Sequence, residues 1–159
     1  MDRDIFNSNM IIIGCGNVLY QDDGIGCNVA NRLIERDQLP DGVQVVDAGL
    51  AAPRLINLLK TGTKRPGIII VDAGDFGGNK GDIKVFSVKE FINNRHSCTS
   101  HGISLSDELL SYNGNVQLVV CQVDEKSMKL KPFVLSKDTE GAVDKACEYV
   151  MSLLKEVNG

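Results

Sequence analysis

Four aspartates and one histidine are the residues of this sequence best suited to bind a metal ion. The adjacent pair Asp22 and Asp23, then Asp47 and Asp72, each follow a short apolar run, and His101 stands just before a predicted helix. Carboxylate oxygens and an imidazole nitrogen together suit zinc, nickel or similar divalent ions, and they leave positions open for water or substrate. The residues therefore predict a divalent metal site whose candidate ligands are Asp23, Asp72 and His101.

The apolar runs before these acids predict parallel strands of an α/β sheet. Met10 to Ile13, Val43 to Val46 and Ile68 to Val71 are short and β-branched, and the segments between them have helical spacing. Strands joined by helical crossovers run parallel, so their carboxyl ends lie at one edge of the sheet. A single acid after a strand is usually only a turn residue, but three such positions at one edge favour a site over turn chemistry alone.

Two further strands and two further helices complete the predicted architecture. The additional strands are Ile83 to Val88, expected at an antiparallel edge, and Val116 to Cys121. A helix is expected from Ile103 to Leu110, and an amphipathic helix from Ala142 to Leu154 closes the chain. The fold class is therefore α/β, with five strands and helices between them.

A nucleotide site is the alternative interpretation of the same glycine loop. Gly14 and Gly16 after a strand resemble the start of a dinucleotide-binding fingerprint, and Asp47 falls where a ribose-binding acid could stand. However, Leu19 occupies the place of the third glycine, and the acidic pair puts negative charge where a pyrophosphate needs positive potential. One acid of the pair is expected to cap the helix that follows, which leaves the other for a metal ion.

A serine hydrolase is a second chemical alternative. Ser100 or Ser104 would be its nucleophile, and His101 is the one base nearby in the sequence. Neighbouring residues rarely point at each other usefully, so this alternative is disfavoured. The sequence also has no Gly-x-Ser-x-Gly, His-Glu-x-x-His or phosphate-binding Walker motif.

Bulk composition excludes several classes of function. The 159 residues predict one domain, residues 1–159, with an apolar share of 43% that is ordinary for a soluble protein. The net charge of -4 and the absence of a basic run argue against nucleic acid as a partner. Uninterrupted apolar runs reach only about five residues, where a membrane span needs roughly twenty. The polar, acidic start is not typical of a signal peptide.

The five cysteines indicate a reducing compartment. Their number is odd, their spacing is wide, and they form no Cys-x-x-Cys pair, which favours free thiols in the cytoplasm over disulfides or structural zinc. Cys15, inside the glycine loop, and Cys98 are candidates for reactive thiols, although a free cysteine more often fills space in a core. The sequence assigns neither of them a role.

Four segments resemble, in order, the [NiFe]-hydrogenase maturation endopeptidases. Gly14 to Gly26 is similar to their opening Gly-x-Gly-Asn-x-Leu loop and acidic pair, and Asp47 to Gly49 to the Asp-Gly-Gly segment after the second strand. Ile70 to Ala73 resembles the third-strand acid of the family, and Thr99 to His101 the histidine element before a helix. The match is collinear over most of the chain. It departs from the family at Ala48, where glycine is usual.

The resemblance implies a fold, an activity and a set of site residues. The fold is a three-layer α/β/α sandwich around a twisted, mixed, mostly parallel sheet of five strands. The activity is that of a cytoplasmic endopeptidase that removes the C-terminal extension of a hydrogenase large-subunit precursor after nickel has been loaded. Asp23, Asp72 and His101 would bind that nickel, brought by the precursor. Asp47 and Gly49 would contact the substrate.

The catalytic group and the hydrogenase served stay open. Either nickel activates the scissile carbonyl or a water as a Lewis acid, or one of Asp23 and Asp72 is the general base. A non-catalytic nickel or precursor-binding chaperone with the same ligands is a further alternative. The loop from Asp72 to Gly81 and the segment from Thr99 to His101 lean toward the branch that serves membrane-linked or deazaflavin-reducing hydrogenases.

Overall fold

A mixed β-sheet organises the part of the chain that the computed structural model describes, residues 4–94, 97–98 and 107–158. Its main strands lie in the order β2-β1-β3-β6-β4. β1, β2, β3 and β6 are parallel, and β4 pairs antiparallel with β6 at one edge. A short strand, β5, pairs antiparallel with the end of β3. The strand bounds are Met10–Cys15 for β1, Val43–Gly49 for β2, Gly67–Asp75 for β3, Ile83–Ser87 for β4, Ser97–Cys98 for β5 and Val116–Gln122 for β6.

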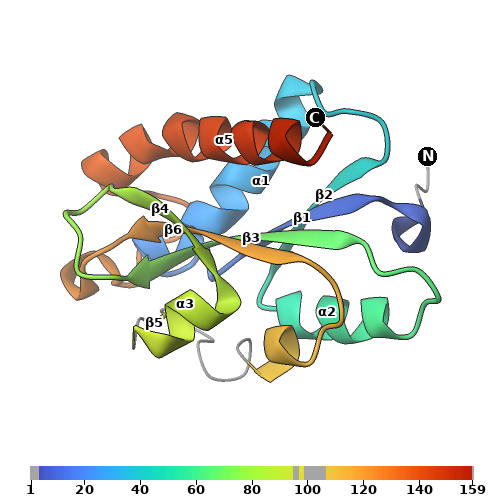
Figure 1. Ribbon diagram of the computed structural model, residues 1–159. Helices are drawn as coiled ribbons and strands as arrows, with labels where there is room; N and C mark the ends of the chain where they lie inside the picture. Colours follow the sequence, from blue (N-terminus) through green and yellow to red (C-terminus); the bar gives the residue numbers. More distant parts are fainter. Residues whose placement is uncertain (1–3, 95–96, 99–106, 159) are drawn as a thin grey trace.

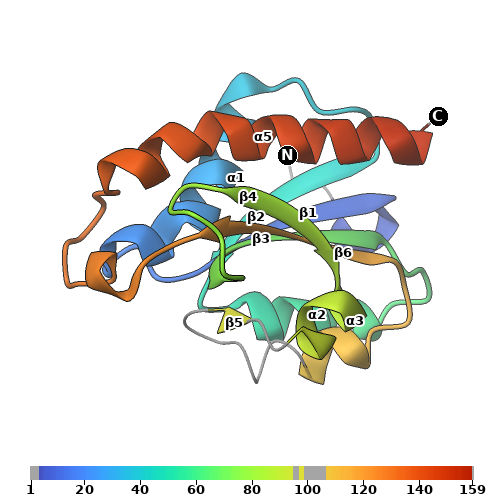
Figure 2. The same ribbon diagram turned by 60° about the vertical axis from the view of Figure 1, so that its left-hand side comes forward.

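Helices cover both faces of the sheet, so the molecule has three layers (Figures 1 and 2). α1 (Ile25–Arg36) and α5 (Lys137–Asn158) lie side by side on one face, and α2 (Ala52–Lys60) and α3 (Val88–Asn93) lie on the other. Residues 107–110 are also helical, and three short 3-10 helices are η1 (Ile5–Asn7), η2 (Gln21–Gly24) and η3 (Glu125–Ser127). This architecture confirms the predicted α/β/α sandwich.

The central strands are apolar on both faces because each face is buried under helices. On β1, Ile12 packs in the core beneath α1 and α5, whereas Ile11 and Ile13 pack in the core beside α2. All three side chains are fully buried. A strand in this position needs continuous apolar sequence rather than alternation, which is why its sequence is a simple apolar run.

Two strands run further than the sequence predicts. β2 continues through Asp47, which pairs with Gly14 of β1, and β3 continues through Asp72, which pairs with Val120 of β6. The expectation that these acids stand in turns after their strands is therefore wrong. Their neighbouring strands extend alongside them and supply backbone hydrogen-bond partners, so the ladder continues past the apolar residues.

The longest helix, α5, illustrates how amphipathic the helices are. It spans 22 residues and turns Ala142, Ala146 and Val150 into the core. Charged residues interrupt its sequence throughout, from Asp138 to Glu156. Among the described helices, none combines the length and the apolar character needed to cross a membrane.

Candidate active site

Gly16 is the point at which two buried acids, Asp23 and Asp72, come together. It follows β1 with a φ of +123°, a conformation that side chains rarely adopt. A Cβ added there would lie 1.9 Å from the carbonyl oxygen of Asp23 and 3.6 Å from Oδ1 of Asp72. Because Gly16 has no side chain, the backbone of Asp23 can pack against it beside the carboxylate of Asp72.

Asp23 is held in η2 by the loop that precedes it. Its Oδ2 accepts a hydrogen bond from the backbone N–H of Asn17 at 3.0 Å, and Oδ1 of Asn17 accepts one from the N–H of Leu19 at 3.0 Å. Only 2% of Asp23 is exposed. These bonds fix the carboxylate against the turn, so Asp23 is an oriented group rather than a solvated side chain.

Asp72 approaches from the next strand of the sheet. Its Oδ1 accepts a hydrogen bond from the N–H of Ala73 at 2.8 Å, and the residue is 2% exposed. Alternation along β3 puts Ile70 in the core beside α2, and Val71 and Ala73 in the core beneath α1. Asp72 therefore projects on the α2 side of the sheet.

Cys27, which the sequence did not single out, lies within reach of the charges of two predicted site acids, Asp47 and Asp72. Its thiol donates to the carbonyl oxygen of Gly16 at a sulfur–oxygen distance of 3.9 Å. Burial, then a hydrogen bond and charge from Asp47, then the charge of Asp72, raise the pKa of the Cys27 thiol strongly. It is therefore a neutral thiol. Asp47 itself is exposed and accepts a hydrogen bond from Nδ2 of Asn31 on α1 at 2.8 Å.

Neither Asp22 nor Asp23 is the capping residue of the helix that follows, contrary to the expectation that one of them caps it. The residue at the start of α1 is Gly24, which has no side-chain capping bond. Asp22 is fully buried and instead accepts hydrogen bonds from the N–H of Ser136 at 2.7 Å and from its hydroxyl at 2.6 Å, while Nζ of Lys80 lies 3.6 Å away. Although burial opposes ionisation, hydrogen bonds from Ser127, Ser136 and Thr139 prevail and lower the pKa of Asp22.

The remaining glycines of the motif let α1 pack closely on the sheet. A Cβ on Gly14 would lie 2.4 Å from the carbonyl oxygen of Gly26, and a Cβ on Gly26 would lie 2.2 Å from that of Val71. Both distances are far below any real carbon–oxygen contact. Gly14, the first glycine of the fingerprint-like pair, is thus explained by helix–strand packing.

Gln122 is a second residue that sequence analysis missed. Its Oε1 accepts hydrogen bonds from the N–H groups of Phe76 and Gly78 at 2.9 and 3.0 Å, and its Nε2 donates to Asp75 at 3.0 Å. Gln122 thus holds the loop that follows β3. A buried amide at the end of a parallel strand was the available signal, because such a group needs polar partners.

The predicted site residues are placed only in part. Asp23 and Asp72 meet beside Gly16, whose N–H donates to the carbonyl oxygen of Gly49 at 3.4 Å. His101, with Thr99 and Ser100, lies outside the described residues. Within the residues that are described, no group of three histidine, cysteine or acidic side chains is arranged to hold a metal ion.

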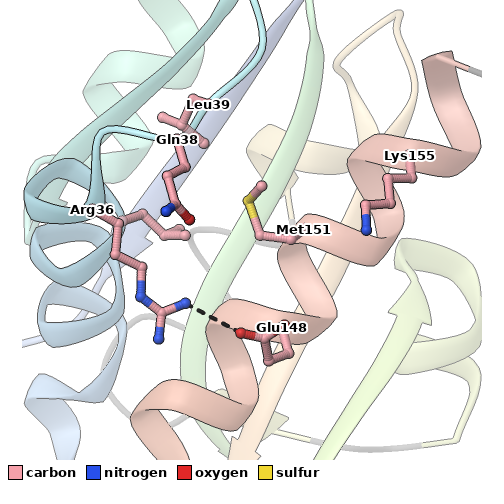
Figure 3. A pocket seen from close by; sticks show the side chains of 7 residues that line it. Arg36, Gln38, Leu39, Glu148, Met151 and Lys155 are labelled. Atoms are coloured by element: carbon pink, nitrogen blue, oxygen red, sulfur yellow. Dashed lines mark hydrogen bonds and ion pairs between the residues drawn. The ribbon is translucent and has the colours of Figure 1, made fainter.

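A pocket between α1 and α5 is separate from this acidic edge. It measures about 180 Å³, and Arg36 forms an ion pair with Glu148 at 3.3 Å. Figure 3 shows these two side chains pointing toward each other. The pocket opens at the C-terminal end of α1, whereas the acids precede its N-terminal end. At about 1.5 Å per residue, the helix separates the two by roughly 18 Å. The pocket is lined by Leu33, Arg36, Gln38, Leu39, Glu148, Met151 and Lys155.

A three-layer α/β/α sandwich with buried carboxylates at the carboxyl edge of its parallel strands is the architecture of an α/β enzyme. The family model described as HycI, hydrogenase maturation protease, matches residues 27–153. The chain belongs to the hydrogenase maturation protease family, a group of hydrolytic endopeptidases.

Relatives over nearly the whole chain agree with this membership. A putative hydrogenase maturation protease from Methanocaldococcus jannaschii is 40% identical over 93% of this chain and 97% of its own. The coenzyme F420 hydrogenase subunit delta from Methanothermobacter thermautotrophicus is 26% identical over 92% and 94%. The family resemblance inferred from the sequence is thereby confirmed.

The fold agrees with a solved structure as well. The hydrogenase maturating endopeptidase HybD from E. coli superposes with a TM-score of 0.77 at 24% identity, covering 94% of this chain and 93% of that one. At this identity the likeness concerns the fold alone. Two further solved structures with this fold are [NiFe] hydrogenase maturation proteases from Thermococcus kodakarensis, each 22% identical, with TM-scores of 0.69 and 0.71.

Proposed function

We propose that this protein removes the C-terminal extension of a nickel-loaded [NiFe]-hydrogenase large-subunit precursor. Family membership supports the reaction class, and the precursor is the substrate that the family implies. The observation that carries the assignment to this site is the approach of Oδ1 of Asp72 to Gly16 beside Asp23. Two buried acids that flank one glycine suit a divalent cation, because such cations take carboxylate oxygens.

In this proposal the nickel belongs to the substrate and Asp23, Asp72 and His101 are its ligands on the protease. Nickel supplies Lewis acidity toward the scissile carbonyl or a water when it is bound. The two acids orient the loaded precursor. In the alternative route, one of them accepts a proton from the attacking water as general base and nickel only positions the substrate. Asp47 and Gly49, at the end of β2, contact the precursor segment next to the cleavage position.

The same proposal places the protein in the cytoplasm. Cys15, Cys27, Cys121 and Cys147 are buried thiols outside any disulfide, as expected in a reducing compartment. The similarity to the coenzyme F420 hydrogenase subunit delta favours a precursor from a deazaflavin-reducing hydrogenase. This preference can be tested by offering precursors of several hydrogenases in parallel.

The decisive experiment is a cleavage assay on a co-purified large-subunit precursor, with and without nickel loading, read by intact mass. We expect loss of a C-terminal peptide only from the nickel-loaded form. H101A should abolish processing without changing the thermal unfolding temperature, whereas H96A is the matched control and should process normally.

Three other outcomes would contradict parts of this proposal. Processing by H101A would remove His101 from the ligand set. Cleavage regardless of nickel would mean that the metal is not recognised. Binding of a matched, loaded precursor without any cleavage would identify the protein as a chaperone instead of a peptidase.

A further inference from the structure

Five large apolar side chains gather on two segments next to the acidic loop. Leu19 and Tyr20 lie on the first segment, and Leu130, Phe133 and Val134 lie on the second. All are exposed, Phe133 most of all at 76%. Exposed apolar side chains are ordinary when scattered, but a contiguous group is typical of an interaction site. We call these five residues the apolar platform.

Backbone hydrogen bonds hold the two segments of the platform together. The N–H of Phe133 donates to the carbonyl oxygen of Val18 at 2.8 Å, and the N–H of Gln21 donates to that of Lys131 at 3.3 Å. Tyr20 and Lys131 also form a β-bridge. The apolar side chains are therefore presented on a preorganised backbone, which lowers the entropy cost of binding.

The backbone of the platform is strained at its most exposed residue. Phe133 has a φ of +61° and Gln21 a φ of +47°, values in the left-handed region. For a residue with a side chain this conformation costs about 1–2 kcal/mol. A bulky aromatic residue held there with most of its surface in solvent gains little from packing, so its presence indicates a functional demand.

The platform is joined directly to the acidic site. Tyr20 and Gln21 lead into Asp22, and Val134 stands two residues before Ser136, whose N–H and hydroxyl both donate to Asp22. A molecule resting on the platform therefore lies beside the loop that carries Asp23. This continuity favours a protein substrate of the site as the occupant, rather than an unrelated partner.

The charge around the platform defines the chemistry of its occupant. Lys126, Lys129 and Lys131 lie on or just before the second segment, and no acid occurs from position 126 to 134, although the chain carries a net charge of -4. A hollow of about 300 Å³ opens beside Phe133 and Val134, toward α1 and α5, and one cation and one acid, Arg32 and Glu140, also line it. A partner surface whose apolar side chains have acidic neighbours complements this combination of apolar and positively charged side chains.

We propose that the apolar platform docks the folded body of the large-subunit precursor, through an apolar patch edged by acidic side chains. The inference rests on the proposed function and adds where the precursor binds. A stable complex buries about 800 Å² on each partner, so the platform is the centre of a larger contact. Phe133 is its anchor, since aromatic residues dominate such centres.

The test compares F133G with L58A in steady-state cleavage of the nickel-loaded precursor. Glycine accepts the φ of Phe133 without strain, so F133G removes the side chain and keeps the fold. We expect the KM of F133G to rise at least about tenfold, as for loss of a binding hot spot, with kcat changed less than about twofold. L58A, which truncates an exposed leucine on α2, should leave both constants unchanged.

A double variant that reverses the charge of two lysines tests their contribution to docking separately from that of Phe133. K129E combined with K131E should raise the KM more at low salt than at high salt, because salt screens the attraction to an acidic rim. K155E, at the far end of α5, is the matched control and should leave the KM unchanged. An unchanged KM in both F133G and the double lysine variant would overturn the proposal.

Binding measurements separate failure of docking from failure of the peptidase assignment. If the wild type binds the precursor without cleaving it and F133G loses that binding, the docking proposal is supported and the peptidase assignment is refuted. If the wild type neither binds nor cleaves, both proposals fall. The wild type could instead bind phosphatidylserine vesicles or self-associate. If F133G abolished either property without changing the KM for the precursor, the platform would be assigned to a membrane or to a second copy.

Discussion

The hydroxyl of Ser136 donates a hydrogen bond to Oδ2 of Asp22 at 2.6 Å, and so joins the loop after β1 to the residue before α5. The backbone N–H of Ser136 donates to the other oxygen at 2.7 Å. One buried carboxylate thus receives both donors of a residue near the far end of the chain. Asp23 follows Asp22 directly in the chain, so these bonds also constrain the backbone at Asp23.

Replacing Asp22 with asparagine should lower the free energy of unfolding. The substitution removes the charge that the hydrogen bonds of Ser136 stabilise, and bonds to charged groups contribute about 1.5–3 kcal/mol each. Urea denaturation at pH 7 measures the change. D144N removes an exposed carboxylate paired with Arg32 and Arg36 and should cost no more than about 1 kcal/mol. Equal losses in both variants would contradict the special role of Asp22.

The contribution of Asp22 should also depend on pH. Its pKa in the folded protein is lowered from the ordinary value of 3.8, so its stabilising effect is present above that value and is lost as the pH falls through the lowered pKa. The stability difference between wild type and D22N should therefore shrink below about pH 4. Unfolding free energies measured between pH 7 and pH 2.5 check this, and a constant difference would refute it.

A methyl group at position 16 should disrupt the site. In G16A the new Cβ would collide with the carbonyl oxygen of Asp23, and the φ of +123° disfavours alanine in any case. We expect loss of precursor cleavage and a free-energy loss of more than about 2 kcal/mol, within the range for backbone strain at a special φ.

The control for this variant is another glycine with open space around it. G141A in α5 meets no atom within 4 Å, and alanine is the better helix former. It should therefore stabilise the protein by about 0.5–1 kcal/mol and leave cleavage intact. Normal cleavage by G16A would mean that the meeting of Asp23 and Asp72 is dispensable.

The buried thiols should resist alkylation in the native protein. Burial and neighbouring acids raise the pKa of Cys27, and burial together with Asp22 raises that of Cys121 to about 12. The thiolate is the reactive form, so both cysteines should stay unmodified by iodoacetamide at pH 8 and react fully in urea. Peptide mapping by mass spectrometry locates the modified residues. Rapid native alkylation of Cys27 would contradict a closed site.

Local patterns predicted most of the architecture. The apolar run from Met10 to Ile13 became β1, the edge strand β4 is antiparallel as expected, and Pro53 lies at the start of α2. These features follow from periodicity and from the fixed φ of proline, which act within a few residues of the chain. Family membership was also predicted correctly, because its motifs are contiguous in the sequence.

Interactions between distant segments decided the rest. The amino-acid sequence by itself determined which segments are strands and helices and which acids stand at the carboxyl ends of the parallel strands. Only the tertiary structure decided that Asp22 binds a residue 114 positions away, that the backbone of Phe133 is bonded to Val18, and that the Cys27 thiol lies within reach of the charges of Asp47 and Asp72. Such partners are chosen by how helices and loops pack around the sheet, and spacing along the chain carries no information about that choice.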